Sequence, residues 1–434
     1  MYSLPEQFVE RMKKILPESE REDFFAVYKK EGYERGLLIN TLKISAEEFE
    51  TTSPLTLCGE VPWAKNARYV KHEKAGGDPY HFAGLYYMQE PSASCVAPKA
   101  EVKAGERVLD LCAAPGGKTA ALAAATEGQG ILVCNEPVPS RAQILLSNAE
   151  RLGVKNAVIT NAYPEEISGF FTEYFDKIVA DAPCSGEGMF RKNAEAARAE
   201  WSEENVRACA ARQSRILNEA AKMLAGGGRL VYSTCTFSRE EDEEQTRNFL
   251  TTHKDFRLLS EEKLLPHKAR GEGHYCAVFE KTQGGRRDLP LQKSNASASA
   301  RKLFDEFCLA ALGETKNYAL YENGGALFAL PPQCFVWKGL KLLRCGVKLG
   351  EIIKNRFEPA HAYALSLQRG EAKNALNLAY DDPRLMKFLR GESVEGRVSG
   401  WCVVCVDGYP LGWGKGVGGT VKNHLPHGLR LRGG

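Results

Sequence analysis

The sequence lacks long apolar runs, and it lacks a strong excess of charge of either sign. No stretch approaches the roughly 20 consecutive apolar residues of a membrane-spanning helix, so we expect no membrane association. The net charge is only +3, from 58 Lys and Arg against 55 Asp and Glu. Because so balanced a chain has a weak overall field, any surface that binds nucleic acid must come from local clusters of Lys and Arg.

The 13 cysteines lack both the regular spacing of a disulfide framework and the two close pairs of a zinc site. They are odd in number and scattered, and the N-terminus lacks a signal peptide, which together indicate reduced thiols in a cytoplasmic protein. Cys402 and Cys405 have zinc-ligand spacing, but no second pair lies nearby, and on a strand they would face opposite sides. We therefore expect two core cysteines there and no metal site.

Apolar strand patterns alternate with helical patterns through the middle of the chain. This alternation is typical of a doubly wound α/β fold with a mostly parallel sheet. The clearest helix covers 205–224, and 434 residues predict more than one domain. The predicted strands are 107–111, 131–134, 157–160, 177–180, 229–232 and 275–279.

Changes in composition divide the chain into five predicted segments. The linker prediction rests on a polar, aperiodic stretch, and the last segment is rich in glycine, short strands and aromatic residues. The segments are an N-terminal α+β domain at 1–85, a central α/β domain at 86–283, a linker at 284–300, a second α+β domain at 301–375 and a small β-barrel at 376–434.

A glycine turn, Gly116-Gly117, separates the first of these strands from a helix that begins near Lys118. Such a turn lets the backbone approach a ligand and directs free N–H groups toward it. A nucleoside-triphosphate loop would need glycine where Cys112 stands, and Ala113-Ala114-Pro115 interrupts a dinucleotide fingerprint. Glu136, at the end of the second strand, could accept both ribose hydroxyls of a nucleoside. The pattern therefore favours another nucleoside cofactor.

Two cysteines each follow an apolar strand. Cys184 lies in Asp181-Ala182-Pro183-Cys184-Ser185-Gly186, and Cys235 ends Tyr232-Ser233-Thr234-Cys235. In an open α/β sheet, groups that act on ligands lie at the carboxyl ends of the strands, so both thiols should meet at one crevice. Two thiols there indicate covalent chemistry, with one as nucleophile and one as helper.

These motifs together resemble those of the Nol/Nop/Sun family of RNA cytosine-5 methyltransferases. The resemblance spans nearly the whole chain, and its three core motifs are specific in order and spacing. They are the cofactor motif Leu109 to Thr119, the Pro-Cys motif Asp181 to Gly188 and the Thr-Cys motif Ser233-Thr234-Cys235. Gln89-Glu90-Pro91-Ser92-Ala93 also looks like the family, and 410–415 with Lys422-Asn423 is similar to the PUA-like tail of its RsmF-type bacterial branch.

The resemblance implies a Rossmann-like methyltransferase core that uses S-adenosylmethionine. By analogy with the family, Cys235 adds to carbon-6 of cytosine, Asp181 hydrogen-bonds ring nitrogen-3, and Cys184 assists release of the product. Lys118 is the cation expected to lower the pKa of the nucleophilic thiol. The residues expected to bind the cofactor are Cys112, Ala113, Ala114, Pro115, Gly116, Gly117, Lys118, Glu136 and Asp181.

The expected partner is RNA, most specifically 16S ribosomal RNA or the small ribosomal subunit, bound by a monomer. A tRNA cytosine-5 methyltransferase and a non-catalytic RNA-binding assembly factor are the alternatives. Local basic clusters are the predicted phosphate contacts. They comprise Lys65, Arg68, Lys71 and Lys74; Arg191 and Lys192; and Lys338, Lys341, Arg344 and Lys348.

Three further features bear on these predictions. Leu38 stands before Ile39-Asn40-Thr41 where relatives usually carry arginine, and the third strand lacks a following aspartate for adenine, so Asn161 or backbone groups are the alternatives. The run Glu240 to Glu244 raises the possibility of a metal site. We predict instead a solvated helix start, with Ser238 and Glu241 as a capping box.

Overall fold

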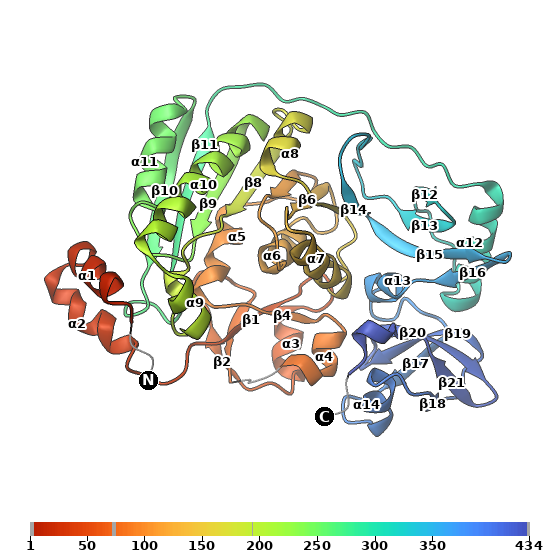
Figure 1. The fold of residues 1–434 in the computed structure, drawn as a ribbon. Helices are drawn as coiled ribbons and strands as arrows, with labels where there is room; N and C mark the ends of the chain where they lie inside the picture. Colours follow the sequence, from red (N-terminus) through yellow and green to blue (C-terminus); the bar gives the residue numbers. More distant parts are fainter. Residues whose placement is uncertain (1–3, 72–74, 193, 432–434) are drawn as a thin grey trace.

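The computed structural model describes residues 4–71, 75–192 and 194–431, arranged around one large sheet (Figure 1). The sheet has eight strands in the order β10-β11-β9-β8-β5-β6-β7-β14. Strands β9, β8, β5, β6 and β7 are parallel, which confirms the predicted α/β class. Their bounds are β5 (Arg107–Asp110), β6 (Ile131–Asn135), β7 (Ala157–Thr160), β8 (Phe175–Asp181), β9 (Leu224–Thr234), β10 (Phe256–Leu264), β11 (His274–Lys281) and β14 (Leu342–Cys345).

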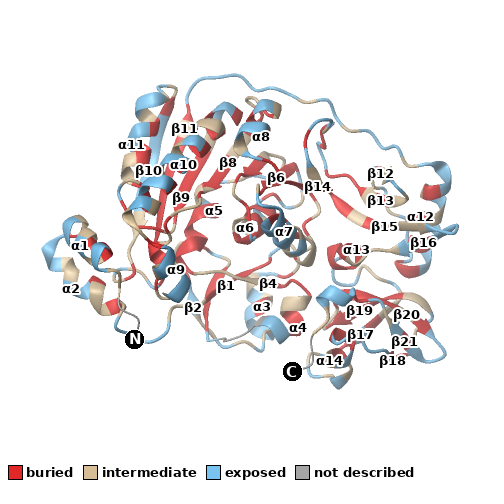
Figure 2. Cartoon of the chain, in the orientation of Figure 1, coloured by how far each residue is buried: buried red, intermediate tan, exposed pale blue. Residues whose placement is uncertain are grey.

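The middle of each central strand is apolar and buried, because both faces of the sheet are covered (Figure 2). Val108 and Leu132 pack into one apolar cluster, whereas their neighbours Leu109 and Val133 pack into another. Helices α5 (Val96–Lys99), α6 (Gly117–Ala125) and α7 (Pro139–Arg151) cover the first face; α8 (Pro164–Phe170), α10 (Glu203–Met223) and α11 (Glu243–Thr252) cover the second. No helix within the described ranges is long and apolar enough to cross a membrane.

Strand β14 joins the central sheet from far along the chain. It pairs antiparallel with β7, with Leu342 opposite Thr160 and Cys345 opposite Val158. The sequence pattern did not indicate this pairing, because about half of the central domain and the whole linker separate the two strands. The segment predicted as 301–375 is therefore joined to the central sheet by a strand.

The N-terminal residues form a four-stranded sheet with flanking helices. Asn40 Nδ2 donates to the carbonyl oxygens of Gly84 and Leu152, both at 2.8 Å, and so ties this sheet to the end of α7. The elements are α1 (Glu6–Ile15), α2 (Glu18–Val27), β1 (Gly36–Ile39), α3 (Ala46–Thr52), β2 (Leu57–Glu60), β3 (Ala67–Val70), α4 (Pro79–Phe82) and β4 (Tyr86–Met88).

After an extended connection over 282–297, the chain forms two smaller sheets (Figure 1). The first contains β12 (Leu320–Asn323), β13 (Ala326–Ala329), β15 (Val347–Ile353) and β16 (Arg356–Pro359), with α12 (Ala298–Ala311) and α13 (His361–Ser366). The second, in the order β17-β19-β20-β21-β18, lies in the C-terminal segment whose motifs resemble a PUA-like tail. It contains β17 (Ala375–Leu378), α14 (Pro383–Leu389), β18 (Val394–Glu395), β19 (Gly400–Val406), β20 (Tyr409–Val417) and β21 (Thr420–Asn423).

The first and last folded parts of the chain pack against each other. Leu37 and Ile39 of β1 share one apolar cluster with Leu378 and Val404 of the C-terminal sheet. Tyr409 Oη also donates to Glu48 Oε1 at 2.9 Å, which adds a polar contact across the same boundary. The N-terminal and PUA-like modules thus form a shared core.

All 13 cysteines are free thiols, as their scattered positions predicted. Cys402 and Cys405 lie on β19 and are both buried. Their side chains enter different apolar clusters on opposite sides of the strand, which confirms the prediction of two core cysteines.

Two arginines predicted to contact RNA are buried structural residues. Arg68 is 5% exposed and pairs with Glu50, and Arg344, at 4% exposed, donates to backbone carbonyl groups. The prediction was wrong for these two, because long basic side chains can satisfy buried acceptors inside the fold. Arg191 is only partly buried and pairs with Glu272 at 3.3 Å. Lys65, Lys71, Lys192, Lys338 and Lys341 are exposed, and Lys74 lies outside the described residues.

Candidate active site

A cavity of about 660 Å³ opens at the carboxyl ends of β5, β6 and β8. This is where the strand order reverses in a doubly wound sheet, the usual position of a ligand. Six of the predicted site residues line it: Cys112, Ala114, Glu136, Asp181, Cys184 and Cys235. Sequence motifs that are up to 123 positions apart therefore contribute to one cavity.

The glycine turn has the geometry that the sequence predicted. Gly116 has φ +115°, a conformation that other residues rarely adopt, and α6 begins at Gly117. A Cβ on Gly117 would lie 2.0 Å from Gln89 Oε1, so a side chain does not fit there. The Ala113 amide donates to the Asn135 carbonyl oxygen at 2.8 Å, and Pro115 O accepts from Asn148 Nδ2 at 2.9 Å, which fixes the loop.

The residues at the cavity fit a nucleoside cofactor. Glu136 is 2% exposed; its Oε1 accepts from the Val138 amide at 2.9 Å, and its Oε2 lies 3.5 Å from Arg141. A carboxylate held in this way retains lone pairs for ribose hydroxyls. The first backbone N–H groups of α6 have no partner within the helix, so they can hydrogen-bond a carboxylate or other acceptor.

Gly117 and Lys118 line a second cavity, of about 500 Å³, between α6 and the N-terminal sheet. The Lys118 side chain nevertheless reaches the first cavity, because its Nζ lies 2.6 Å from Asp181 Oδ2. The ammonium group is therefore paired with Asp181. Among the described residues, no hydrogen bond or ion pair joins it to either sulfur.

The two thiols lie side by side at the ends of β8 and β9. Cys184 Sγ is 3.2 Å from Cys235 Sγ, and the Cys235 amide donates to Cys184 Sγ at 3.4 Å. The neighbouring sulfur, together with burial, raises the pKa of Cys184 well above its ordinary value. Cys184 is therefore protonated at neutral pH and can act as a proton donor beside Cys235.

Asp181 is held in its ionised form by its neighbours. Burial alone would raise the pKa of this carboxyl, but Lys118 and His274 outweigh burial and lower it. His274 Nε2 lies 3.3 Å from Oδ1, and Ser233 Oγ donates to the same oxygen at 2.7 Å. No local sequence pattern marks His274 as a site residue, because only the pairing of β11 with β9 brings it to Asp181.

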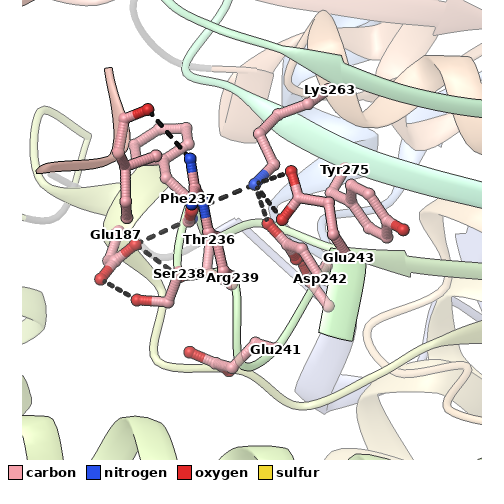
Figure 3. Close-up of polar contacts among 12 residues, drawn as sticks. Glu187, Thr236, Phe237, Ser238, Arg239, Glu241, Asp242, Glu243, Lys263 and Tyr275 are labelled. Carbon is pink, nitrogen blue, oxygen red and sulfur yellow. Dashed lines mark hydrogen bonds and ion pairs between the residues drawn. The ribbon is translucent and has the colours of Figure 1, made fainter. Parts of the chain in front are cut away.

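The acidic run does not form the predicted solvated helix start. Helix α11 begins at Glu243, and Glu241 is completely buried, accepting from the Ser185 amide at 3.0 Å and from Gln213 Nε2 at 2.8 Å. Ser238 Oγ donates to Glu187 instead, at 2.7 Å (Figure 3). The capping-box prediction was wrong, because Ser238 and Glu241 each bind residues that are distant in sequence and do not cap the helix.

The mouth of the cavity carries aromatic and basic side chains. Tyr163 is 65% exposed there, and Arg212 and Arg215 of α10 are exposed on the same rim. Asn161, one alternative for adenine recognition, donates instead to the carbonyl oxygens of Glu136 and Pro137, at 2.8 and 2.9 Å. The Asn161 side-chain amide therefore links the segments that follow β6 and β7.

Family models match four successive parts of the chain. They describe the N-terminal domain of 16S rRNA methyltransferase RsmF (4–91), 16S rRNA methyltransferase RsmB/F (98–284), the RsmF rRNA methyltransferase first C-terminal domain (306–367) and the methyltransferase RsmF PUA domain (375–431).

Whole-length relatives and solved structures agree with these matches. The chain is 33% identical to ribosomal RNA small subunit methyltransferase F of Vibrio vulnificus, over 98% of this chain and 97% of the relative. It is 30% identical to the protein of the same name from a Shewanella species, over 99% and 98%. A methyltransferase homolog from Pyrococcus horikoshii has 25% identity and a TM-score of 0.55, covering 64% of this chain and all of that one. NSun6 from the same organism, solved with SFG, shares the fold at 21% identity with a TM-score of 0.56, over 64% of this chain and 98% of that one.

Proposed function

The chain belongs to the RsmB/F family of 16S rRNA methyltransferases, as its motifs predicted, and on that premise we propose that it methylates carbon-5 of a cytosine in small-subunit ribosomal RNA. It is an S-adenosylmethionine-dependent RNA methyltransferase. The observation that carries the proposed chemistry is the separation of 3.2 Å between Cys184 Sγ and Cys235 Sγ, beside Asp181 in one cavity.

The proposed reaction proceeds through a covalent adduct. The Cys235 thiolate forms a bond to carbon-6, and the ring electrons displaced by this addition make carbon-5 nucleophilic. Bound S-adenosylmethionine supplies the methyl group that carbon-5 then attacks. As sulfur adds, nitrogen-3 takes up a proton from solvent, and the ionised Asp181 accepts a hydrogen bond from the resulting N–H group and so stabilises the charge that develops. A water molecule then takes the carbon-5 proton, and the electrons of that C–H bond restore the ring double bond and expel the Cys235 sulfur from carbon-6; nitrogen-3 gives its proton back to solvent.

Cys184 and Lys118 are proposed to support these steps. The Lys118 ammonium keeps Asp181 ionised and in place, at 2.6 Å. The protonated Cys184 lies against the attacking sulfur, so it can donate its proton to the Cys235 sulfur as that sulfur leaves carbon-6. We place the action in the cytoplasm, on the RNA or the small subunit, and with one copy of the chain; the free cysteines suit a reducing compartment.

Bisulfite sequencing of ribosomal RNA and tRNA from a deletion strain tests this function. We expect one or more cytosines of small-subunit ribosomal RNA to lose protection in that strain. Loss confined to tRNA would replace the proposal with a tRNA methyltransferase. Unchanged methylation together with a growth defect would favour a non-catalytic assembly factor.

Glu136→Gln tests the cofactor site. We expect the dissociation constant for S-adenosylmethionine to rise about 10- to 100-fold, because hydrogen bonds to a charged group contribute about 1.5–3 kcal/mol. Isothermal titration calorimetry measures the constant without RNA. Glu127→Gln, an exposed carboxylate just past α6, is the matched control, and equal affinities of both variants would contradict the role of Glu136.

Arg212→Ala combined with Arg215→Ala tests the rim as an RNA surface. No ion pair joins either guanidinium to another described residue, so both are available for phosphate groups. We expect the slope of log affinity against log salt to fall by about 2, since each phosphate contact contributes about one. Arg257→Ala, on the far-edge strand β10, should leave the slope unchanged. An unaltered slope in the double variant would show that Arg212 and Arg215 do not contact the RNA phosphates.

A further inference from the structure

The residues that follow the two cysteines are held by carboxylates from the opposite loop. We call residues 182–188 the Cys184 loop and residues 235–242 the Cys235 loop. Ser185 follows Cys184, and Thr236 follows Cys235. Their hydroxyl oxygens lie 2.9 Å apart, so the loops already touch directly behind the thiols.

Glu241 of the Cys235 loop binds the Cys184 loop. Its Oε2 accepts from the Ser185 amide at 3.0 Å, and its Oε1 accepts from Ser185 Oγ. Gln213 of α10 links the same parts, since its Nε2 donates to Glu241 Oε2 at 2.8 Å and to the Pro183 carbonyl oxygen at 3.0 Å. The backbone is therefore held by hydrogen bonds at Pro183 and Ser185, the residues immediately before and after Cys184.

Glu187 of the Cys184 loop binds the Cys235 loop in return (Figure 3). Its Oε2 accepts from Thr236 Oγ1 and from the Phe237 amide, both at 2.8 Å. Its Oε1 accepts from Ser238 Oγ at 2.7 Å and from Trp201 Nε1 at 3.0 Å. Glu187 is 1% exposed, so these four donors take the place of water.

Further hydrogen bonds and an ion pair restrict the movement of both loops. Tyr232 Oη donates to the Glu241 carbonyl oxygen at 2.6 Å, and Lys263 Nζ lies 2.9 Å from Asp242 Oδ2 (Figure 3). The Gly188 amide donates to the Cys235 carbonyl oxygen at 2.9 Å, and a Cβ on Gly188 would lie 3.0 Å from that same oxygen. Neither loop can shift without breaking bonds to the other.

We infer that Glu241 and Glu187 are positioning residues for different steps of the reaction: Glu241 holds Cys184 for release of the product, and Glu187 holds Cys235 for attack on the base. This inference rests on the proposed function. Neither carboxylate lines the cavity, so neither is placed to touch the cofactor or the RNA base. Each acts through the residue that follows a cysteine.

The test compares Glu241→Ala and Glu187→Ala with their glutamine variants. Glutamine keeps a carbonyl acceptor for the backbone amide, so Glu241→Gln and Glu187→Gln should recover most of the lost rate. Labelled RNA on denaturing gels measures the covalent adduct, and single-turnover assays measure methyl transfer. Glu240→Gln is the matched control, because that neighbouring carboxylate pairs with Arg11 at 2.6 Å instead.

We expect the two alanine variants to fail in opposite ways. Glu241→Ala should accumulate adduct, with release slowed about tenfold or more, whereas Glu187→Ala should form adduct up to about 100-fold more slowly, because misplacement of a reacting group by about 1 Å has effects of that size. Identical phenotypes, or normal release in Glu241→Ala, would overturn the inference. If the wild type methylates no cytosine, the proposed function fails instead.

A readout without RNA separates positioning from general destabilisation. Diamide removes two hydrogen atoms from a pair of adjacent thiols, forms a disulfide and is itself reduced to a hydrazine. At 3.2 Å, Cys184 and Cys235 should join rapidly in the wild type and in Glu240→Gln. Mass spectrometry should show slower joining in both alanine variants at temperatures where circular dichroism shows them folded. Unchanged joining would contradict the positioning role, even if a variant is less stable.

Discussion

Replacing Cys235 with alanine is expected to abolish methyl transfer while S-adenosylmethionine binding stays nearly unchanged. Without the sulfur that we propose adds to carbon-6, carbon-5 would remain a poor nucleophile, and loss of a covalent nucleophile typically costs about 10³-fold or more in rate. The side chain is small and partly exposed at the cavity, so its removal should not disturb the fold. Transfer of a labelled methyl group to RNA and calorimetric titration of the cofactor measure the two quantities.

Cys209→Ala provides the matched control for this experiment. Cys209 is a buried thiol of α10 that lines no part of the cavity, so this variant should keep full activity. Retained activity in Cys235→Ala, with no activity in Cys184→Ala, would assign the nucleophile to Cys184. Loss of cofactor binding in Cys235→Ala would mean that the side chain supports the pocket itself.

Cys184→Ala should have the opposite effect and accumulate a protein–RNA adduct that survives denaturation. The protonated Cys184 thiol lies 3.2 Å from Cys235 Sγ, where it can assist the departure of that sulfur. Without it, addition and methyl transfer proceed but the bond to carbon-6 persists. A band of reduced mobility on a denaturing gel, sensitive to nuclease, measures the adduct.

The double variant Cys184→Ala with Cys235→Ala checks which sulfur is bound. It should form no adduct, because the attacking atom is missing. An adduct in the double variant would indicate another nucleophile. Absence of an adduct in Cys184→Ala with RNA that the wild type methylates would show that Cys184 has no part in release.

Local sequence patterns were sufficient for the five parallel strands and for β11, but not for the edge strands β10 and β14. Predicted strands 107–111 and 157–160 correspond to β5 (Arg107–Asp110) and β7 (Ala157–Thr160), because the middle of a buried parallel strand is apolar. The meeting of Cys184 and Cys235 also followed from the pattern, since the carboxyl ends of parallel strands share one edge.

Features that depend on distant parts of the chain were not predictable in this way. His274 reaches Asp181 only through the pairing of β11 with β9, and β14 pairs with a strand about 180 positions earlier. Glu241 follows Ser238 at the spacing of a helix cap, and no local signal distinguishes that role from binding Ser185. Similarly, Arg68 and Arg344 are buried by partners that their sequence neighbourhood does not reveal.

The packing of the PUA-like module on the N-terminal sheet has a consequence for target choice. Since Leu37, Ile39, Leu378 and Val404 belong to one apolar cluster, the distance from the C-terminal module to Cys184 and Cys235 is set by the packed protein and not by a flexible tether. An RNA that touches both ends of this span must present its cytosine at that distance through its own folded shape. The enzyme would then select its target cytosine by the distance between that base and the RNA segment bound at the C-terminal module, with little need to contact the neighbouring bases.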